Sequence, residues 1–163
     1  LFPLPFEAKI FEEAQKQGLP AALISSIMRQ ESLFNPLARS PADAFGLMQL
    51  IPEMAMAAAK TLGVSFRGPD DLYEPDKNIT LGTAFLKELF KKYDDRFILA
   101  VSAYNANDRA IQGWIRTRMR ADPLEFIEEI PYDETRLYVK TLRPKVGSLF
   151  DSIYDLFQPK RAV

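Results

Sequence analysis

The stretch that decides the fold is Pro20–Ser32, with the sequence PAALISSIMRQES. Its residues Ile24, Ile27 and Met28 recur at helical spacing, and its first residue is a proline, which commonly opens a helix. Three residues after Met28 comes Glu31, so its carboxyl group continues the apolar face of the predicted helix. Burial disfavours the charged form, so we expect a raised pKa for Glu31. The alternative is a structural carboxylate with a buried partner.

Helical spacing recurs on both sides of this stretch, and no segment shows the sustained alternation that would require a strand. The sequence therefore predicts an all-α protein. Its 163 residues fit one domain, spanning 1–163, that folds without metals or disulfides. Phe34–Gly46 is expected to be a loop and Val64–Tyr73 an irregular connection. Helices are expected at Phe6–Gly18, Pro20–Ser32, Pro52–Gly63, Pro75–Phe90, Asp95–Asn105, Asp108–Ile115, Asp122–Glu129, and from Asp133 to a kink at Pro144.

The apolar faces of these helices predict which side chains are buried. Phe11 lies on the expected inward face of the first helix, and Tyr104 ends that of the helix at 95–105. Asp108 is expected to cap the helix that follows, and Asp133 the last one. The other inward residues are Phe6, Ile10, Ala14, Phe97, Ala100, Val101, Ile111, Trp114 and Ile115.

The composition removes several classes of chemistry. The chain has no cysteine and no histidine, which excludes thiol catalysis, Ser-His-Asp hydrolysis and His-ligated zinc sites and leaves carboxylates as the acid-base groups. The net charge of −1, without a cluster of basic residues, predicts a neutral partner and no nucleic acid. No stretch is apolar for long enough to predict a transmembrane segment. Because the chain begins at Leu1, we expect a mature or excised segment of a longer protein, with a signal peptide or an upstream domain removed.

Six short motifs follow one another in a defined order. Glu31-Ser32 is followed by Asn35-Pro36 and Ser40-Pro41, and then by Gly46-Leu47-Met48-Gln49. Downstream come Ala103-Tyr104-Asn105-Ala106 and Ile130-Pro131-Tyr132-Asp133-Glu134-Thr135-Arg136. In this combination the chain resembles the soluble lytic transglycosylases from about Pro20 to Arg143. The resemblance implies a goose-type lysozyme-like helical fold with a substrate cleft.

The same resemblance implies a reaction. Glu31 occupies the position of the family's sole general acid and base, which cleaves the β-1,4 bond between N-acetylmuramic acid (MurNAc) and N-acetylglucosamine (GlcNAc) in peptidoglycan. The acetamido group of the sugar supplies the second reactive group, and the product ends in 1,6-anhydroMurNAc. No metal and no organic cofactor is expected. The partner is the glycan strand of the bacterial wall, so the expected location is periplasmic or otherwise exported.

Seven further residues match positions of the family's binding site. Ser40 matches a serine that orients the acetamido group, although it could also cap a turn before Pro41. Tyr104 matches a residue near the cleaved bond, with core packing as its alternative, and Asn105 binds sugar or supports the loop. Glu134 matches a residue that binds glycan or peptide, or serves as a first-turn acid favoured by the helix dipole. Of the other three, Gln49 is expected near the acid, and Gly46 and Met48 are expected to line the cleft. Glycine is expected at position 46 because a side chain there would crowd the saccharide.

Three residues depart from the family pattern. Phe45 stands before the Gly-Leu-Met-Gln motif where a small residue is common, and Ile51 replaces a frequent methionine. Asn107 follows Asn105-Ala106 where glycine is typical, and asparagine tolerates the left-handed backbone region better than most residues.

Two other functions are compatible with the sequence. A hydrolytic muramidase of the goose-type lysozyme kind would need a second carboxylate to position water, and Asp43 is the candidate. An inactive peptidoglycan-binding or assembly module would keep the cleft as a scaffold. The presence of Glu31 together with Ser40, Gln49 and Tyr104 favours an enzyme.

Overall fold

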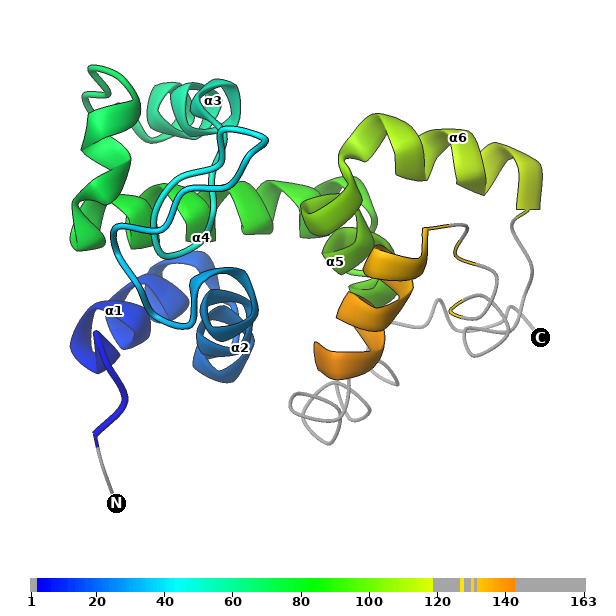
Figure 1. The fold of residues 1–163 in the computed structure, drawn as a ribbon, viewed down its shortest axis with the longest axis horizontal. Helices are drawn as coiled ribbons and strands as arrows, with labels where there is room; N and C mark the ends of the chain where they lie inside the picture. The colour runs from blue at the N-terminus through cyan, green and yellow to red at the C-terminus, as the bar shows by residue number, and fades with distance from the viewer. Residues whose placement is uncertain (1–2, 119–126, 128–129, 131, 143–163) are drawn as a thin grey trace. The chain divides into compact units, whose positions relative to one another are not determined.

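The structure is a computed structural model that describes residues 3–118, 127, 130 and 132–142 (Figure 1). These residues form helices and two isolated β-bridges, and they contain no strand, which confirms the all-α prediction. Pro144 and most of the helix predicted at Asp122–Glu129 lie outside them. The helices are α1 (Glu7–Gln17), α2 (Ala21–Ser32), α3 (Pro52–Leu62), the 3-10 helix η1 (Pro69–Tyr73), α4 (Pro75–Lys92), α5 (Phe97–Ala106), α6 (Asp108–Arg118) and a helical segment at 133–142.

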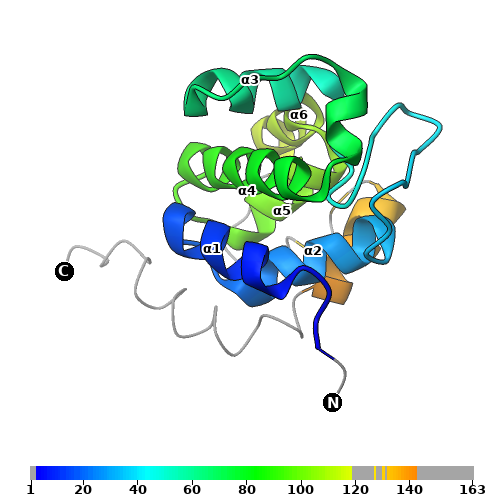
Figure 2. The same ribbon diagram turned by 90° about the vertical axis from the view of Figure 1, so that its left-hand side faces the viewer.

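The chain divides into two compact units, Leu1–Lys87 and Glu88–Val163, and the boundary between them falls within α4. In the first unit α1 packs on α2, and Figure 2 shows α4 between α1 and α3. The side chains of α3 and α4 meet in a buried cluster that also takes in the loop between α2 and α3. Its members are Phe45, Leu50, Ala55, Ala58, Ala59, Leu72, Leu81 and Ala84.

The helix ends in this unit follow from the sequence. Pro52 and Pro75 are the first residues of α3 and α4, as their fixed φ angle and missing N–H favour. Gly63 ends α3 in the left-handed conformation, and its N–H donates to Ala59 and Lys60 carbonyls. The segment Val64–Tyr73, predicted as an irregular connection, contains the helix η1. The sequence did not predict this helix because helical spacing is hard to detect over five residues.

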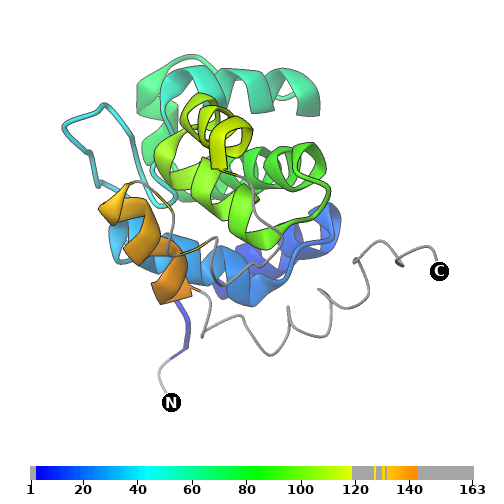
Figure 3. The same cartoon turned by 90° about the vertical axis from the view of Figure 1, so that its right-hand side faces the viewer.

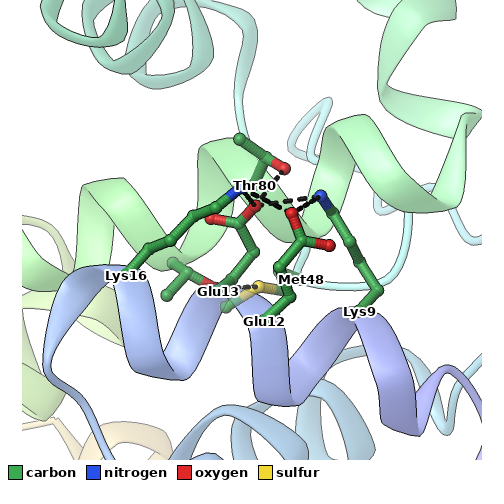
Figure 4. A network of polar contacts seen from close by, with 7 residues as sticks. Lys9, Glu12, Glu13, Lys16, Met48 and Thr80 are labelled. Carbon is green, nitrogen blue, oxygen red and sulfur yellow. Dashed lines mark hydrogen bonds and ion pairs between the residues drawn. The ribbon is translucent and has the colours of Figure 1, made fainter.

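The buried face of α1 differs from the predicted one. Phe11 is 56% exposed, whereas Glu13 is 2% exposed. Figure 4 shows why this carboxylate is tolerated: Lys9 Nζ lies 2.9 Å and Lys16 Nζ 3.7 Å from its Oε1, and the Thr80 hydroxyl of α4 donates to the same atom at 2.9 Å. The two lysine ammonium groups and the threonine hydroxyl replace the water that Glu13 loses on burial. The pattern of apolar residues in the sequence does not reveal these contacts.

A second buried carboxylate fixes η1. Asp71 accepts hydrogen bonds from the Arg67 backbone N–H at 2.9 Å, from Lys77 Nζ at 3.0 Å, and from Arg67 Nη2 at 2.9 Å. Each donor favours the ionised carboxylate, so together they hold the pKa of Asp71 well below its usual range. The bonds join the connection after α3 to the first turn of α4.

In the second unit α5 is buried along most of its length. Every residue from Phe97 to Ala103 is buried, and α6 packs against this helix. Figure 3 shows α5, α6 and the segment at 133–142 from the side of this unit. The segment at 133–142 is helical as predicted. Among the described residues, no helix combines the length and the apolar character needed to cross a bilayer.

The cap of α6 is Asn107 and not Asp108 as predicted. Asn107 Oδ1 accepts the N–H of Ala110 at 3.0 Å, which is the bond of an N-cap. Asp108 instead accepts a hydrogen bond from the Tyr93 hydroxyl at 2.6 Å and pairs with Lys92. Burial opposes ionisation of Asp108, but these two donors lower its pKa. Asn107 and Asp108 are adjacent and both are residue types that cap helices, so the sequence did not decide which of them caps α6.

We expect Asp71→Asn to lower the melting temperature at neutral pH, and this difference to shrink in acid. The folded pKa of Asp71 lies below the usual 3.8, so its charge stabilises the fold above about pH 4 and this contribution is lost as the pH falls toward the folded value. Thermal melts followed by circular dichroism between about pH 3 and 7 measure the effect. The matched control is Asp70→Asn at the exposed neighbouring position. A difference that stayed constant across this range would contradict the assignment.

Candidate functional site

The acid predicted from the sequence lies at the end of α2. Glu31 is in the last turn of this helix, next to the apolar face formed by Ile24, Ile27 and Met28, each 0% exposed. Glu31 itself is half-buried, so its expected removal from water is partial. Leu33 ends the helix in the left-handed conformation, with its N–H donating to the Arg29 carbonyl.

A hydrogen bond joins this helix end to the Gly46–Gln49 segment. The hydroxyl of Ser32 donates to the Leu47 carbonyl at 2.7 Å, and it lies 3.1 Å from the Met28 carbonyl of its own helix. The acid and the Gly-Leu-Met-Gln motif, which are separate in sequence, are thereby tied together through the residue next to Glu31.

The Gly46–Gln49 segment is held from its other side by Asn78 of α4. Asn78 is fully buried; its Oδ1 accepts the Met48 N–H at 2.8 Å, and its Nδ2 donates to the carbonyls of Phe45 and Leu72, each at 2.9 Å. The amide thus satisfies three backbone groups that lie out of water. Sequence reasoning missed this residue. The available signal was an amide directly before Ile79, on the predicted helix at 75–90.

Gly46 is required by packing within the chain. Its φ is +76°, and a Cβ atom at this position would lie 2.1 Å from the Leu72 carbonyl oxygen and 2.3 Å from Asn78 Nδ2. The sequence analysis attributed this glycine to crowding by a saccharide; the structure supplies a sufficient reason inside the fold. A contact of the Gly46 backbone with sugar stays a prediction.

Met48 and Gln49 support the same segment. Met48 is 0% exposed and packs against Gly82, where a Cβ would lie 2.5 Å from its sulfur. Its side chain therefore faces the interior, which disagrees with the predicted cleft-lining role. Gln49 is half-buried, and its Nε2 donates to the carbonyls of Gly46 at 2.9 Å and Ala38 at 3.2 Å.

Ser40 caps a turn, as the alternative to its binding role predicted. Its Oγ accepts the N–H of Ala42 at 3.2 Å and of Ala44 at 3.1 Å. A serine hydroxyl has two acceptor positions and one proton to donate. Since both acceptor positions are occupied, the hydroxyl proton is what Ser40 can offer to a ligand, and the two roles are compatible.

Asp43, the candidate second carboxylate, is engaged with arginine. The Nη2 of Arg39 lies 2.6 Å from Asp43 Oδ1 and Nε lies 3.2 Å from the same atom, and both side chains are largely exposed. Arg39 Cζ also lies over the ring of Phe45, 5.1 Å from its centre. The arginine thus pairs with one of the two carboxylate oxygens of Asp43.

The remaining predicted residues lie in the second unit. Tyr104 is half-buried on α5, and the neighbouring Asn105 accepts a hydrogen bond from the Thr135 hydroxyl at 2.8 Å. This bond ties α5 to the helical segment at 133–142 and supports the structural role proposed for Asn105. Glu134 is exposed in the first turn of that segment. Asn107, which replaces the typical glycine, combines a φ of +80° with a ψ of 151°, so its φ is positive but it lies outside the left-handed helical region.

No group of three or more His, Cys, Asp or Glu side chains among the described residues is placed to hold a metal ion.

Comparison with known sequences assigns the family. The sequence model described as "Transglycosylase SLT domain" matches residues 8–127, and the chain belongs to this family. The match extends across both units and includes Glu31, Ser40 and Tyr104. Glu134 lies beyond it.

The chain is similar to soluble lytic murein transglycosylases. It is 35% identical over 143 residues to the protein of Salmonella typhimurium, which covers 86% of this chain and 22% of that protein. It is 33% identical over 158 residues to the Escherichia coli K12 protein, with coverage of 96% and 24%. The chain therefore spans about a quarter of the length of these relatives.

Solved structures of the same kind share the fold. An inactive mutant of lytic transglycosylase Slt from Pseudomonas aeruginosa has a TM-score of 0.84 and 34% identity, over 97% of this chain and 26% of that one. A complex of the 70-kDa soluble lytic transglycosylase with bulgecin A has a TM-score of 0.82 and 31% identity, over 97% and 25%. The predicted lysozyme-like helical fold is confirmed.

We expect Gly46→Ala to lower the free energy of unfolding by at least about 2 kcal/mol, because the added Cβ would meet backbone and the Asn78 amide. The matched control is Gly63→Ala. Gly63 has a similar φ of +68° but nothing within 4 Å of an added Cβ, so that variant should lose roughly 1 kcal/mol from the left-handed backbone alone. Urea unfolding measures both. Equal losses would show that Gly46 answers only a backbone requirement.

Proposed function

We propose that this chain is the catalytic part of a peptidoglycan lytic transglycosylase. It would cleave the β-1,4 bond between MurNAc and GlcNAc and leave 1,6-anhydroMurNAc ends. The observation that carries the proposal is the position of Glu31 within the family match, at the end of α2 and tied through Ser32 to the Gly-Leu-Met-Gln motif.

Glu31 would act first as an acid and then as a base. As the acid it gives its proton to the glycosidic oxygen of the leaving sugar, while the acetamido oxygen of MurNAc attacks its own anomeric carbon. The ionised Glu31 then takes the proton of the 6-hydroxyl, whose oxygen attacks the same carbon and releases the acetamido group. One glycosidic bond is broken and one is formed, Glu31 ends protonated again, and no water is consumed.

The helix supports the first of these states. Glu31 lies at the carboxyl end of α2, where the unpaired carbonyl groups carry partial negative charge and disfavour a second negative charge nearby. Partial burial acts in the same direction. Both features support the choice of Glu31 as the acid of the proposed reaction.

Ser40 would orient the acetamido group. Its two acceptor positions are filled by the N–H groups of Ala42 and Ala44, so its hydroxyl can only donate to a bound ligand. An acetamido group presents a carbonyl oxygen, which is the matching acceptor. The bond would hold that oxygen in line with the anomeric carbon.

The engagement of Asp43 favours this route over hydrolysis. A hydrolytic muramidase needs a second carboxylate that can accept a proton from water. Asp43 instead pairs with the Arg39 guanidinium, which lies 2.6 Å from its Oδ1, so this carboxylate is already engaged within its own turn. The described residues offer no better-placed candidate in the loop after α2.

The substrate implies the setting. Glycan strands lie in the bacterial cell wall, so we propose an exported, periplasmic location and peptidoglycan as the partner. The relatives are about four times longer than the stretch they share with this chain, which supports a further domain upstream in the full protein. Tyr104 and Glu134 are proposed to contact the glycan or its peptide.

We expect Glu31→Gln to abolish release of anhydro-muropeptides from purified peptidoglycan, by at least about 1,000-fold, while glycan binding is retained. Glutamine keeps the size and polarity of the side chain but cannot give up a proton. The matched control, Glu53→Gln at an exposed position in the first turn of α3, should keep normal turnover. Mass spectrometry of the released fragments measures both variants.

Digestion in water enriched in ¹⁸O separates the alternatives. A transglycosylase gives anhydro ends without label, whereas a hydrolytic muramidase gives labelled reducing ends. Unchanged turnover of Glu31→Gln would refute the catalytic assignment. No fragments from the unsubstituted chain, with glycan binding intact, would indicate the binding or assembly module.

A further inference from the structure

The turn that carries Ser40 is closed by backbone bonds. The Ser40 N–H donates to the Ala44 carbonyl at 2.9 Å, and the Asp43 N–H donates to the Ser40 carbonyl at 3.1 Å. The Ser40 hydroxyl oxygen accepts two N–H groups inside the same turn. Asp43 has φ +56°, a conformation that aspartate tolerates better than most residues. The direction in which the hydroxyl proton can point therefore depends on the shape of this turn.

Two side chains close the turn from outside. Arg39 and Asp43 flank Ser40, and their ion pair spans the turn with two contacts to one carboxylate oxygen, at 2.6 and 3.2 Å. The guanidinium also lies on the ring of Phe45, 5.1 Å from its centre. We call Arg39 and Asp43 the Arg39 clasp.

Phe45 gives the clasp a fixed base. It is 5% exposed, contacts the ring of Tyr73 edge-on at 5.7 Å, and exchanges two backbone hydrogen bonds with Leu50, at 2.9 and 3.1 Å. Its carbonyl also receives a bond from Asn78. The clasp is exposed, but the ring beneath it belongs to the core of the first unit.

We propose that Arg39 and Asp43, seated on Phe45, are positioning residues that orient the Ser40 hydroxyl toward the acetamido group of the substrate. The proposal rests on the function proposed above. It gives a role to Phe45, which stands where the family commonly has a small residue, because a small residue would offer no surface to the guanidinium.

The energies involved indicate positioning rather than stability. Exposed ion pairs and exposed cation–π contacts are each weak, so loss of the clasp should change the melting temperature by only a few degrees. Reaction rates are more sensitive, since a shift of about 1 Å in an orienting group can reduce turnover many-fold. A weak contact at an exposed turn can therefore be measured in kinetics.

A double-mutant cycle tests the proposal, with Arg39→Ala and Ser40→Ala made singly and together. Turnover is measured as release of anhydro ends from glycan strands stripped of stem peptides. We expect Arg39→Ala to lower turnover about fivefold and Ser40→Ala about tenfold or more, with Arg39→Ala costing less than about twofold once Ser40 is gone. Arg39→Lys, which keeps a cation beside Asp43 and Phe45, should recover much of the loss.

The control is an exposed ion pair of the same strength elsewhere. Lys91 and Glu88 of α4 lie 2.9 Å apart and are similarly exposed, so Lys91→Ala should leave turnover unchanged. The melting temperatures of Arg39→Ala and Lys91→Ala should agree within a few degrees. A fall in melting temperature that accounts for the lost turnover would overturn the proposal.

Additive losses would overturn it as well, because they would mean that Arg39 acts on the substrate directly or by another route. If the unsubstituted chain releases no anhydro ends, the proposed function fails first. The cycle is then measured on binding of the N-acetylglucosamine tetrasaccharide, by calorimetry. Losses of affinity that are coupled between Arg39 and Ser40 would support the positioning role of the clasp even though the proposed reaction had failed. Additive losses, or no losses, would refute that role.

Discussion

The side-chain amide of Asn78 is the interaction on which the arrangement of the first unit depends. From inside the core it binds the backbone of Phe45, Met48 and Leu72, and so holds the Gly46–Gln49 segment against the start of α4. The amide is a partner for the Met48 N–H and the Leu72 carbonyl, and a second partner for the Phe45 carbonyl, which also accepts the Leu50 N–H. The segment in turn binds Ser32, the neighbour of Glu31. The position of the acid is thus connected to the core through the Ser32 hydroxyl, the backbone of the Gly46–Gln49 segment and the Asn78 amide.

Much of the motif's chemistry is therefore structural. Gly46 provides room for the Asn78 amide, Met48 fills the space over Gly82, and Gln49 bonds to carbonyls of its own loop. Ser40 and Asp43 are the loop residues whose functional groups are exposed enough to affect a ligand, and they lie in one turn. A motif shared by a family of enzymes need not consist of residues that touch the substrate. Here most of it forms the support for one acid.

Sequence reasoning predicted the helices well, because proline and glycine mark their ends and the apolar spacing is long. It placed Glu31 on the buried face of α2, and the structure has this residue half-buried in the last turn of that helix. It failed where a partner distant in the sequence compensates the burial of a polar side chain. The two cases are Glu13, which bonds to Thr80, and Asn78, which bonds to Phe45. It also placed the α6 cap one residue late and took Phe11 for a core residue. These errors share a cause, since a periodic pattern records average burial along one helix and contains no information on which helix lies opposite.

The positive φ of Asn107 has a consequence for how this fold can change over evolution. Glycine at the turn between α5 and α6 would permit the backbone angle but could not cap the next helix, whereas asparagine does both. Exchange of asparagine for glycine at this position thus changes the backbone conformation little. The two residues differ mainly in the rigidity that they give to the turn. Relatives that carry one or the other can drift between them through a single amino-acid replacement, which lets turn stiffness be selected independently of the helices on either side.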